Sequence, residues 1–351
     1  MLSSKRFERE GVLMNRQSRR GKVTLNDVAA RAGVSPSTVS KVLNSRSDVS
    51  AATRERVLSV VAETGYRAAP RRDRGGRQAL TVVLDFLASP YAGTLMQEML
   101  AAATELEADL RLSLPPGAPA EVWVAEQRAA GAVGLIELAV PLPGAVLAAA
   151  RDQGLPVVAI DPLGIADPRA VTIGSANWAG GRTVTEHVIR FGHTDIAWVG
   201  GPLHSAPSAE RFQGYRAALD AANLVADPAL ICHDAFTVEA GFRHGRRLLA
   251  LDRPPTAVVA GNDEIAIGVL AAARERGVDV PRDLSVTGFD GTPLAEWATP
   301  GLTSVEQPLA GMGRMAVETV LGMARGVRPA SRHLQLATTL TVRDSTGPVS
   351  V

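Results

Sequence analysis

The chain carries a group of short polar side chains and one lysine between residues 35 and 44. The polar members are Ser35, Ser37, Thr38, Lys41 and Asn44. The apolar members, Val39, Val42 and Leu43, recur at helical spacing and therefore fall on the opposite side of a helix. Hydroxyls, an amide and an ammonium group on the polar face can hydrogen-bond base edges in the major groove of DNA. A small helical bundle without a partner is the alternative interpretation.

A second group of polar and aromatic residues is centred on Asp161, Asn262-Asp263 and Asp290, which follow apolar runs that we predict to be strands. Its members are Tyr91, Asp161, Arg211, Phe236, Asn262 and Asp290. The carboxylates, the amide and the guanidinium combine acceptors with donors, so they can hydrogen-bond the hydroxyls of a small ligand. The two aromatic rings could pack on the apolar face of a sugar. Taken singly, such residues are more often helix caps or core residues.

The sequence offers little for catalysis. It lacks the H-E-x-x-H zinc pattern, the G-x-x-x-x-G-K-[ST] phosphate loop, the G-x-S-x-G nucleophile turn and any cysteine cluster. The six histidines are scattered without the spacing of metal ligands. We therefore predict neither an enzyme nor a resident metal or cofactor. The glycine pairs at 180–181 and 200–201 are interpreted as close-packing and turn residues.

Local sequence predicts how the residues between 35 and 44 are positioned. Thr24 has the N-cap position of a helix over Leu25–Ala32, and Gly33 ends that helix because it tolerates a positive φ. Ser35-Pro36 then supplies an N-cap and a first-turn proline for a second helix. Ser50 has the same capping role for a third helix. The pattern is a helix-turn-helix followed by one more helix.

From residue 80 onward, short apolar runs alternate with amphipathic helical patterns. The predicted strands are Leu80–Phe86, Leu110–Leu114, Ala132–Leu138, Pro156–Ile160, Ala170–Ile173, Asp195–Val199, Thr256–Ala260 and Leu284–Gly288. The predicted helices between them include Leu95–Ala108, Asn177–Phe191, Ala209–Ala221, Glu239–Leu251 and Asp263–Arg276. This alternation predicts an α/β fold with parallel, doubly wound sheets covered on both faces. Because about 270 residues are too many for a domain built on one sheet, we expect two lobes. A ligand cleft is expected at the carboxyl ends of the strands.

Charge is unevenly distributed along the 351 residues. Residues 1–78 carry 17 lysines and arginines against 7 acidic residues, whereas the remainder carries 20 against 29. A basic head on an acidic body indicates a nucleic-acid contact confined to the N-terminus. Cys232 is the only cysteine, so no internal disulfide is possible, and no convincing secretory signal or membrane span is present. These features predict a cytoplasmic protein that does not associate with membranes.

Two further stretches lie on either side of the three predicted helices. Residues 1–21 are polar and arginine-rich, which predicts a disordered basic extension. Residues 67–79 are predicted to be a linker, interrupted by Pro70 and Gly75-Gly76. We expect its arginines Arg71, Arg72 and Arg74 to follow the DNA backbone, with a solvated connector as the alternative.

The stretch TLNDVAARAGVSPSTVSKVLN resembles the DNA-reading headpiece of the LacI/GalR family of bacterial transcription regulators. The similarity extends over roughly residues 22–345 through short motifs, which are FGH at 191–193, RFQGY at 211–215, GND at 261–263, VPRDLSV at 280–286, GFD at 288–290 and PGLTSV at 300–305. It implies a periplasmic-binding-protein-like core in which the chain crosses three times between lobes. The implied domains are a headpiece at 22–66, a linker at 67–79 and a core at 80–348. The first lobe spans about 80–174 and 305–334, and the second about 175–304 and 335–348.

The resemblance also implies roles for both groups of residues. The residues expected to contact DNA are Thr24, Ser35, Ser37, Thr38, Lys41, Asn44, Tyr66, Arg71, Arg72 and Arg74. The matches to effector-contacting positions are Asp161, Arg211, Asn262 and Asp290, and the matches to stacking positions are Tyr91 and Phe236. Two places depart from the family pattern. Ala176-Asn177 replaces an Asp-Asn pair, and Gly75 stands where the family's linker helix carries a leucine.

Together these inferences predict a homodimeric transcription repressor of carbohydrate-utilisation genes that binds a roughly palindromic operator in double-stranded DNA. A small sugar-like effector between the lobes would control it. The second hypothesis is a cytoplasmic solute-binding component without a regulatory role, against which the charged headpiece argues. The third is an α/β enzyme, for which the sequence supplies no nucleophile or metal site.

Overall fold

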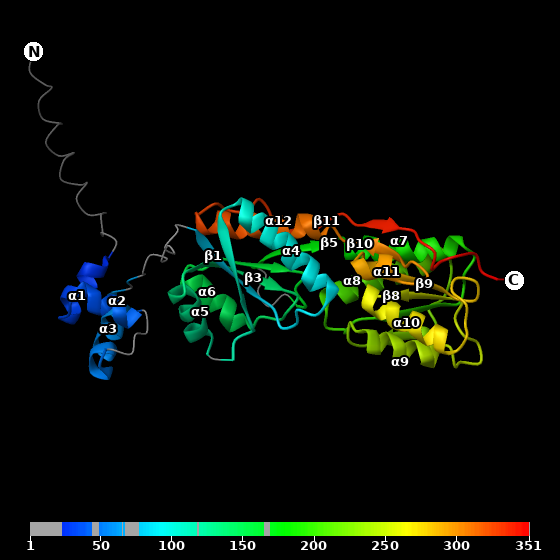
Figure 1. Cartoon of the computed structure of the whole chain (residues 1–351), viewed down its shortest axis with the longest axis horizontal. Coiled ribbons are helices and arrows are strands. Elements are labelled where there is room, and N and C mark those ends of the chain that lie inside the picture. Colours follow the sequence, from blue (N-terminus) through cyan, green and yellow to red (C-terminus); the bar gives the residue numbers. More distant parts are fainter. Residues whose placement is uncertain are drawn as a thin grey trace, which may run out of the picture. The chain divides into compact units, whose positions relative to one another are not determined.

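The computed structural model describes residues 23–43, 49–64, 66, 77–117, 119–164 and 169–350. The chain forms two compact units, Met1–Arg71 and Arg72–Val351 (Figure 1). Several positions with a predicted role lie outside the described residues, namely the extension at 1–21, Asn44, Pro70, Arg71, Arg72, Arg74 and Gly75.

The described part of the first unit is a bundle of three helices. They are α1 (Leu25–Ala32), α2 (Pro36–Leu43) and α3 (Ala51–Thr64). Each helix contributes one fully buried valine to the shared core, and these are Val28, Val39 and Val57. The bounds of α1 are those that the sequence predicts.

Side-chain caps define where these helices begin. The hydroxyl of Thr24 accepts from the Asp27 N–H at 3.3 Å, and the Asp27 carboxylate accepts from the Thr24 N–H at 2.8 Å, which completes the predicted capping box. Gly33 has φ 64°, the left-handed conformation that ends α1. The hydroxyl of Ser35 accepts from the Thr38 N–H at 3.1 Å and thereby caps α2.

The second unit contains two six-stranded sheets, each covered by helices on both faces (Figure 1). The first sheet has the order β11-β5-β4-β3-β1-β2 and is parallel throughout. Its strands are β1 (Gln78–Val83), β2 (Ala108–Ser113), β3 (Ala132–Leu138), β4 (Val157–Ile160), β5 (Val171–Ser175) and β11 (His333–Leu336). Its helices are α4 (Pro90–Glu105) and α12 (Leu309–Ala324) on one face, and α5 (Ala120–Ala129) and α6 (Gly144–Asp152) on the other.

The second sheet has the order β12-β10-β9-β8-β6-β7, and its pairs are parallel except for β10 with β12. Its strands are β6 (Ile196–Gly200), β7 (Ile231–His233), β8 (Ala257–Ala260), β9 (Ser285–Asp290), β10 (Thr303–Glu306) and β12 (Thr339–Thr341). Its helices are α7 (Asn177–Arg190) and α8 (Ala206–Ala221) on one face, and α9 (Val238–Leu248) and α10 (Asp263–Glu275) on the other, with the short η1 (Pro228–Leu230) and α11 (Pro293–Trp297) beside them. The predicted fold class of two parallel, doubly wound lobes is confirmed.

Four short strands, β7, β10, β11 and β12, are additions to the predicted set. Three of them, β7, β11 and β12, are edge strands, each paired with a single neighbouring strand. An edge strand is less buried than a central one, so it does not need a continuous apolar run. Two predicted helices begin too late. The sequence pattern indicates Ala209–Ala221, whereas α8 begins at Ala206. It also indicates Leu95–Ala108, whereas α4 begins at Pro90, directly after Ser89. This is the same serine–proline start that marks α2, since proline is favoured in the first turn of a helix.

The chain crosses between the sheets three times, as the family resemblance implies. The crossings lie between β5 and α7, between β10 and α12, and between β11 and β12. Because β10 stays in the second sheet through Glu306 and β11 in the first through Leu336, the last two crossings come slightly later than predicted. Among the described helices, none has both the length and the apolar character required to cross a bilayer.

Glu137 is a carboxyl group buried inside the first lobe. It lies on β3 with only 3% of its surface exposed. Burial raises the pKa of Glu137 to about 7, and a hydrogen bond from the Leu142 backbone N–H opposes part of that shift. Between its ordinary pKa of 4.5 and about 7, the folded state therefore holds a proton that the unfolded state has released.

It follows that stability should decrease as the pH rises through this window, and that Glu137→Gln should remove the effect. We expect the variant to resemble the wild type near pH 4.5 and to be more stable at pH 8, by at most about 3 kcal/mol. Urea denaturation at both pH values measures the difference. The exposed Glu126→Gln, on α5 of the same lobe, is the control and should change little at either pH. Equal stability of Glu137→Gln and wild type at pH 8 would contradict the prediction.

Candidate DNA interface and interlobe ligand site

The predicted DNA-reading face of α2 is accessible in the first unit. Ser35, Ser37 and Lys41 are exposed and Thr38 is partly buried, while Val39 on the other side is fully buried. The Ser35 hydroxyl lies 2.7 Å from that of Ser37 and 2.8 Å from that of Thr38. Small hydroxyls that hydrogen-bond one another can exchange those partners for base edges without a large desolvation penalty.

The other predicted DNA-contacting residues are less clearly disposed. Thr24 is exposed, but its side chain is engaged in the cap of α1. Tyr66 is partly buried and packs against the headpiece core. Asn44, Arg71, Arg72 and Arg74 lie outside the described residues. Their roles in DNA binding therefore remain predictions.

Arg211 on α8 is the centre of the second candidate site. The residue is 4% exposed, and its guanidinium donates to three acceptors from different segments. Its Nε donates to Asn177 Oδ1 at 2.7 Å, and its Nη1 donates to the Gly261 carbonyl at 2.7 Å and to Asp290 Oδ1 at 3.1 Å. The guanidinium carbon also lies 3.8 Å from the centre of the Phe289 ring. A buried charge is tolerated here because it is both paired and hydrogen-bonded.

Asp290 directly ends β9 and balances Arg211. Its backbone has φ 105°, a conformation that residues other than glycine rarely adopt. Residues in such conformations are concentrated at functional sites. Its Oδ1 accepts from Gln307 Nε2 at 2.7 Å in addition to Arg211. Burial raises the pKa of Asp290 to about 6, although the Arg211 charge and the Gln307 hydrogen bond lower it. The carboxylate is therefore ionised at neutral pH and loses its charge in mildly acidic solution.

Asp161 reaches the same region from the first lobe. It follows β4 with φ 43°, so both aspartates of the site sit in a conformation that costs free energy. The Tyr91 hydroxyl, from the start of α4, donates to Asp161 Oδ2 at 2.6 Å. Burial raises the pKa of Asp161, while the Tyr91 hydrogen bond and the Arg211 charge lower it. The structure therefore brings Tyr91, Asp161, Arg211 and Asp290 together.

Asn262 and Phe236 have other contacts in the described structure. Asn262 is 4% exposed and accepts from the Ile265 N–H at 2.9 Å, so its oxygen serves as the N-cap of α10. The Phe236 ring covers Gly201, where an added Cβ would lie 2.2 Å from the ring. Asn262 adjoins Gly261, a partner of Arg211, whereas no hydrogen bond or ring contact joins Phe236 to the Arg211 cluster in the described part of the chain. Their effector contacts remain predictions.

Two polar residues of this site, Asn177 and Gln307, are not among those that the sequence predicts to bind a ligand. Asn177 and Gln307 hold Arg211 and Asp290, and each follows the end of a strand, which is the pattern that identifies Asp161. Asp263, at the start of α10, accepts from the Thr292 N–H at 2.7 Å and from the Ser304 hydroxyl at 2.6 Å. Burial and the neighbouring Asp290 raise the pKa of Asp263 to about 7.

Glycines in α7 and α8 allow Arg211 to reach its partners. A Cβ added at Gly181 on α7 would lie 2.3 Å from the Arg211 carbonyl oxygen, and one at Gly214 on α8 would lie 2.1 Å from the Trp178 carbonyl oxygen. The two helix backbones are therefore in direct contact, which brings Arg211 on one helix beside Asn177 on the other. The interpretation of Gly180-Gly181 as close-packing residues is confirmed.

Hydrogen bonds also link the two lobes around this cluster. Ser89 Oγ of the first lobe donates to Glu264 Oε2 of the second at 3.0 Å, and the Ala206 N–H donates to the Leu163 carbonyl at 3.1 Å. Gln335 Nε2 donates to Glu210 Oε2 at 3.3 Å. Within the described ranges, His, Cys, Asp and Glu form no cluster suited to a metal ion. Polar groups of both lobes therefore converge around the Arg211 cluster.

Comparisons with known proteins find matches for both units of the chain. Residues 24–68 match the family described as bacterial regulatory proteins, lacI family, and residues 185–346 match the periplasmic binding protein-like domain. The chain is 32% identical to the HTH-type transcriptional regulator DegA of Bacillus subtilis (strain 168), over 94% of this chain and 99% of the relative. It is 34% identical to the HTH-type transcriptional regulator CelR of Thermobifida fusca, over 93% of this chain and 99% of the relative.

Two solved structures extend these comparisons. A transcriptional regulator CelR–cellobiose complex has a TM-score of 0.70 and 32% identity, covering 92% of this chain and 99% of that one. The lac repressor dimer bound to operator and the anti-inducer ONPF has a TM-score of 0.68 and 27% identity, covering 93% of this chain and all of that one (100%).

The α7–α8 contact leads to a prediction about Gly214→Ala. The new methyl group would collide with the Trp178 carbonyl, so the helices must separate and Arg211 must shift. We expect the free energy of unfolding to fall by about 1–3 kcal/mol, measured by urea denaturation. Gly93→Ala, at an exposed position of α4 with nothing within 4 Å of the added carbon, is the control and should be neutral or stabilising. Wild-type stability of Gly214→Ala would show that the contact is not close.

Proposed function

This chain belongs to the LacI family of bacterial regulatory proteins, and we propose that it represses genes of carbohydrate use in response to a small sugar-like effector. Like its relatives, it is a DNA-binding transcription regulator and not an enzyme. The observation that carries the proposal is the buried cluster around Arg211, in which polar side chains of both lobes meet at the carboxyl ends of the strands. Ligands of doubly wound folds bind at that end of the sheet.

The chemistry of the cluster supports a neutral ligand with several hydroxyl groups. Asp161 and Asp290 would repel an anion, whereas each can accept hydrogen bonds from hydroxyls. Tyr91 places an aromatic ring beside Asp161, where it can cover the apolar face of a sugar ring. The CelR relative has been solved with cellobiose, which supports a sugar as the class of effector.

On the DNA side, two copies of the chain would place their α2 helices in successive major grooves of a pseudo-palindromic operator. Ser35, Ser37, Thr38, Lys41 and Asn44 would read bases, and Thr24, Tyr66, Arg71, Arg72 and Arg74 would contact the backbone. The effector would act by changing the angle between the lobes, which hydrogen bonds such as Ser89–Glu264 and Gln335–Glu210 connect. We place this activity in the cytoplasm, where operator DNA lies.

The assignment of α2 predicts that Ser37→Ala and Lys41→Ala change the preference among operators. Removing one hydrogen bond to a base should alter discrimination by roughly 1–3 kcal/mol at the position that the side chain reads. Binding to a library of randomised operators measures this preference. Arg72→Ala is the comparison, since removing one phosphate contact should weaken binding to all sequences and lower the salt slope of log K by about 0.9. Wild-type preference in both α2 variants would exclude α2 as the reading helix.

The assignment of the interlobe site predicts a pH-dependent effector response that depends on Asp290. Because the Asp290 carboxylate must be charged to pair with Arg211, effector affinity should fall as the pH drops through about 6. Asp290→Asn should bind the effector at least about tenfold more weakly at pH 7.5, a loss of about 1.4 kcal/mol, and should lose the pH step. DNA affinity without effector should stay near that of the wild type.

Calorimetry at pH 5.5 and 7.5 tests this, with cellobiose first and then the sugar that gives the largest thermal shift in a screen. Arg211→Ala should also abolish the response, and thermal denaturation shows whether that variant is folded. Undiminished effector affinity in a folded Arg211→Ala and in Asp290→Asn would refute the site.

A further inference from the structure

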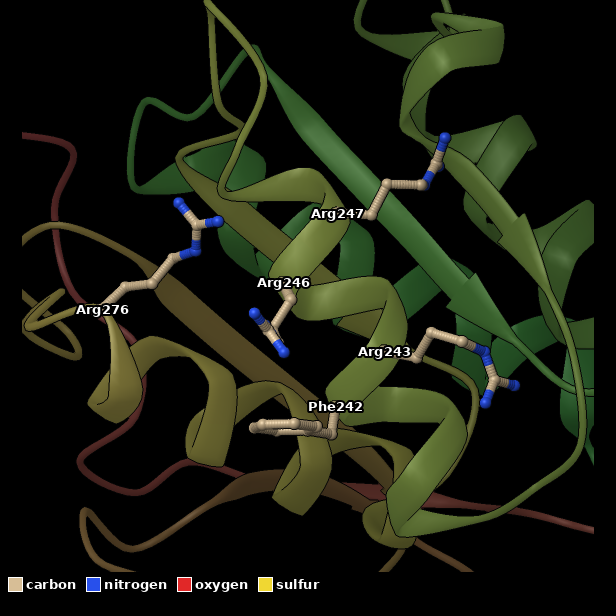
Figure 2. Close-up of a pocket in the computed structure, with 5 residues that line it drawn as sticks. All are labelled: Phe242, Arg243, Arg246, Arg247 and Arg276. Carbon is tan, nitrogen blue, oxygen red and sulfur yellow. The ribbon is translucent and has the colours of Figure 1, made fainter.

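A cavity lies on the α9–α10 face of the second lobe, and none of its lining residues belongs to the Arg211 cluster. Its volume is about 370 Å³, which falls in the range of small-molecule sites. Five residues line it, and they are Phe242, Arg243, Arg246, Arg247 and Arg276 (Figure 2). Four come from α9, and Arg276 comes from the end of α10. We call this the arginine cavity.

The positive charge of the arginine cavity exceeds what its neighbours neutralise. Among the described residues, Arg243 pairs with Asp234 at 2.5 Å and Arg246 pairs with Glu275 at 3.0 Å. Arg247 and Arg276 instead donate to neutral atoms, including the carbonyls of Ala229 at 3.1 Å and Leu249 at 3.3 Å. Four guanidinium groups thus face two carboxylates.

This charge is not explained by helix stability alone. The C-terminal end of a helix favours cations, which accounts for Arg246 and Arg247 in the last turn of α9. However, Arg243 lies three and four residues before them, and like charges at those spacings destabilise a helix. Arg276 adds a fourth like charge from a different helix. A bound anion would relieve this repulsion.

The guanidinium groups also keep donors available. Arg246 pairs with Glu275 through Nε, and the side chain is 53% exposed, so its terminal nitrogens can reach a ligand. Arg276 donates from one terminal nitrogen to the Leu249 carbonyl. Each guanidinium has five N–H donors, so others remain for a ligand. One planar guanidinium group can donate two parallel hydrogen bonds to two oxygens of a phosphate.

Phe242 gives the cavity an apolar wall. Its ring is partly exposed, and the Arg246 guanidinium carbon lies 5.8 Å from the ring centre. Figure 2 shows the ring beside Arg246, with Arg276 on the neighbouring element. An aromatic face next to guanidinium groups can stack a planar ring whose charged part the arginines hold.

We propose that the arginine cavity binds a small polyphosphate, either inorganic or carried by a nucleotide, at a site separate from the effector site between the lobes. Arg246 and Arg276 hold the phosphates, while Arg243 and Arg247, whose guanidinium groups point away from these two and contact Asp234, Ala229 and Cys232, add positive charge nearby (Figure 2). The Phe242 ring covers the base if the ligand is a nucleotide. The site gives the protein a second ligand whose binding does not require the sugar site.

Calorimetry on the full chain at physiological salt tests the proposal, with tripolyphosphate and ATP as the two probes. The double variant Arg246→Gln/Arg276→Gln should bind both probes at least about tenfold more weakly, a loss of about 1.4 kcal/mol. Arg253→Gln is the matched control, because this arginine is in the same lobe with its side chain 88% exposed and lies outside the cavity. Non-specific attraction to the basic headpiece is the same in all these proteins and therefore cancels.

The Phe242→Ala variant distinguishes the two sources of phosphate. A selective loss of ATP affinity assigns the site to a nucleotide, whereas unchanged affinity for both probes assigns it to inorganic polyphosphate. Equal affinities of the double variant, the Arg253→Gln control and the wild type would overturn the proposal. The absence of measurable binding by the wild type would overturn it as well. Arg276→Gln alone, at an exposed helix end, provides a second variant if the double variant is unstable.

Discussion

The buried charge of Arg211 is the constraint around which the second unit is arranged. A guanidinium removed from water must be paired and hydrogen-bonded, and breaking such a pair costs roughly 3–5 kcal/mol. The three acceptors come from the start of α7, the end of β8 and the end of β9, so satisfying one side chain holds three segments in register. The backbone contact of α7 with α8 exists at the same place, because Gly181 leaves no side chain between Arg211 and its partner helix. The close packing of α7 against α8 is therefore needed for the Arg211–Asn177 hydrogen bond to form.

The two aspartates show how the fold would prepare the proposed ligand site before a ligand binds. Asp161 and Asp290 both have positive φ, a conformation that costs about 1–3 kcal/mol per residue. Each is held there by neighbours. Tyr91 donates to Asp161, and Arg211 and Gln307 donate to Asp290. A ligand then meets oriented acceptors and does not have to order them.

The sequence predicts best what depends on neighbours along the chain. The bounds of α1 follow from Thr24 and Gly33, whose capping and turn roles need no tertiary contact. The short strands β7 and β12 escape prediction because three residues carry no periodicity, and their identity as strands comes from the sheet they join. The three chain crossings follow from the family resemblance and not from any local pattern. In the site, Asp161, Arg211 and Asp290 are recognisable as strand-end or motif residues. Asn177 is not, because β5 ends at Ser175, two residues after the predicted strand end. Gln307 is not, because β10, the strand that it follows, is not predicted. The positive φ of the aspartates has no signature in side-chain type.

The carboxylates between the lobes connect ligand chemistry with lobe movement. Burial raises the pKa of Glu210 and of Glu264, and the charges of Asp161 and Asp290 respectively raise them further. Both glutamates accept hydrogen bonds across the lobe boundary, from Gln335 and from Ser89. Bringing the lobes together therefore has two opposing effects, because it completes these hydrogen bonds and it crowds negative charges that Arg211 alone cannot balance. A ligand that donates several hydroxyl hydrogens to the carboxylates reduces the repulsion without adding charge, and so stabilises the closed arrangement more than the open one. An anion would increase the repulsion in the same arrangement. The electrostatics that would select the proposed neutral hydroxylated ligand are thus the same electrostatics through which that ligand would control the angle between the lobes.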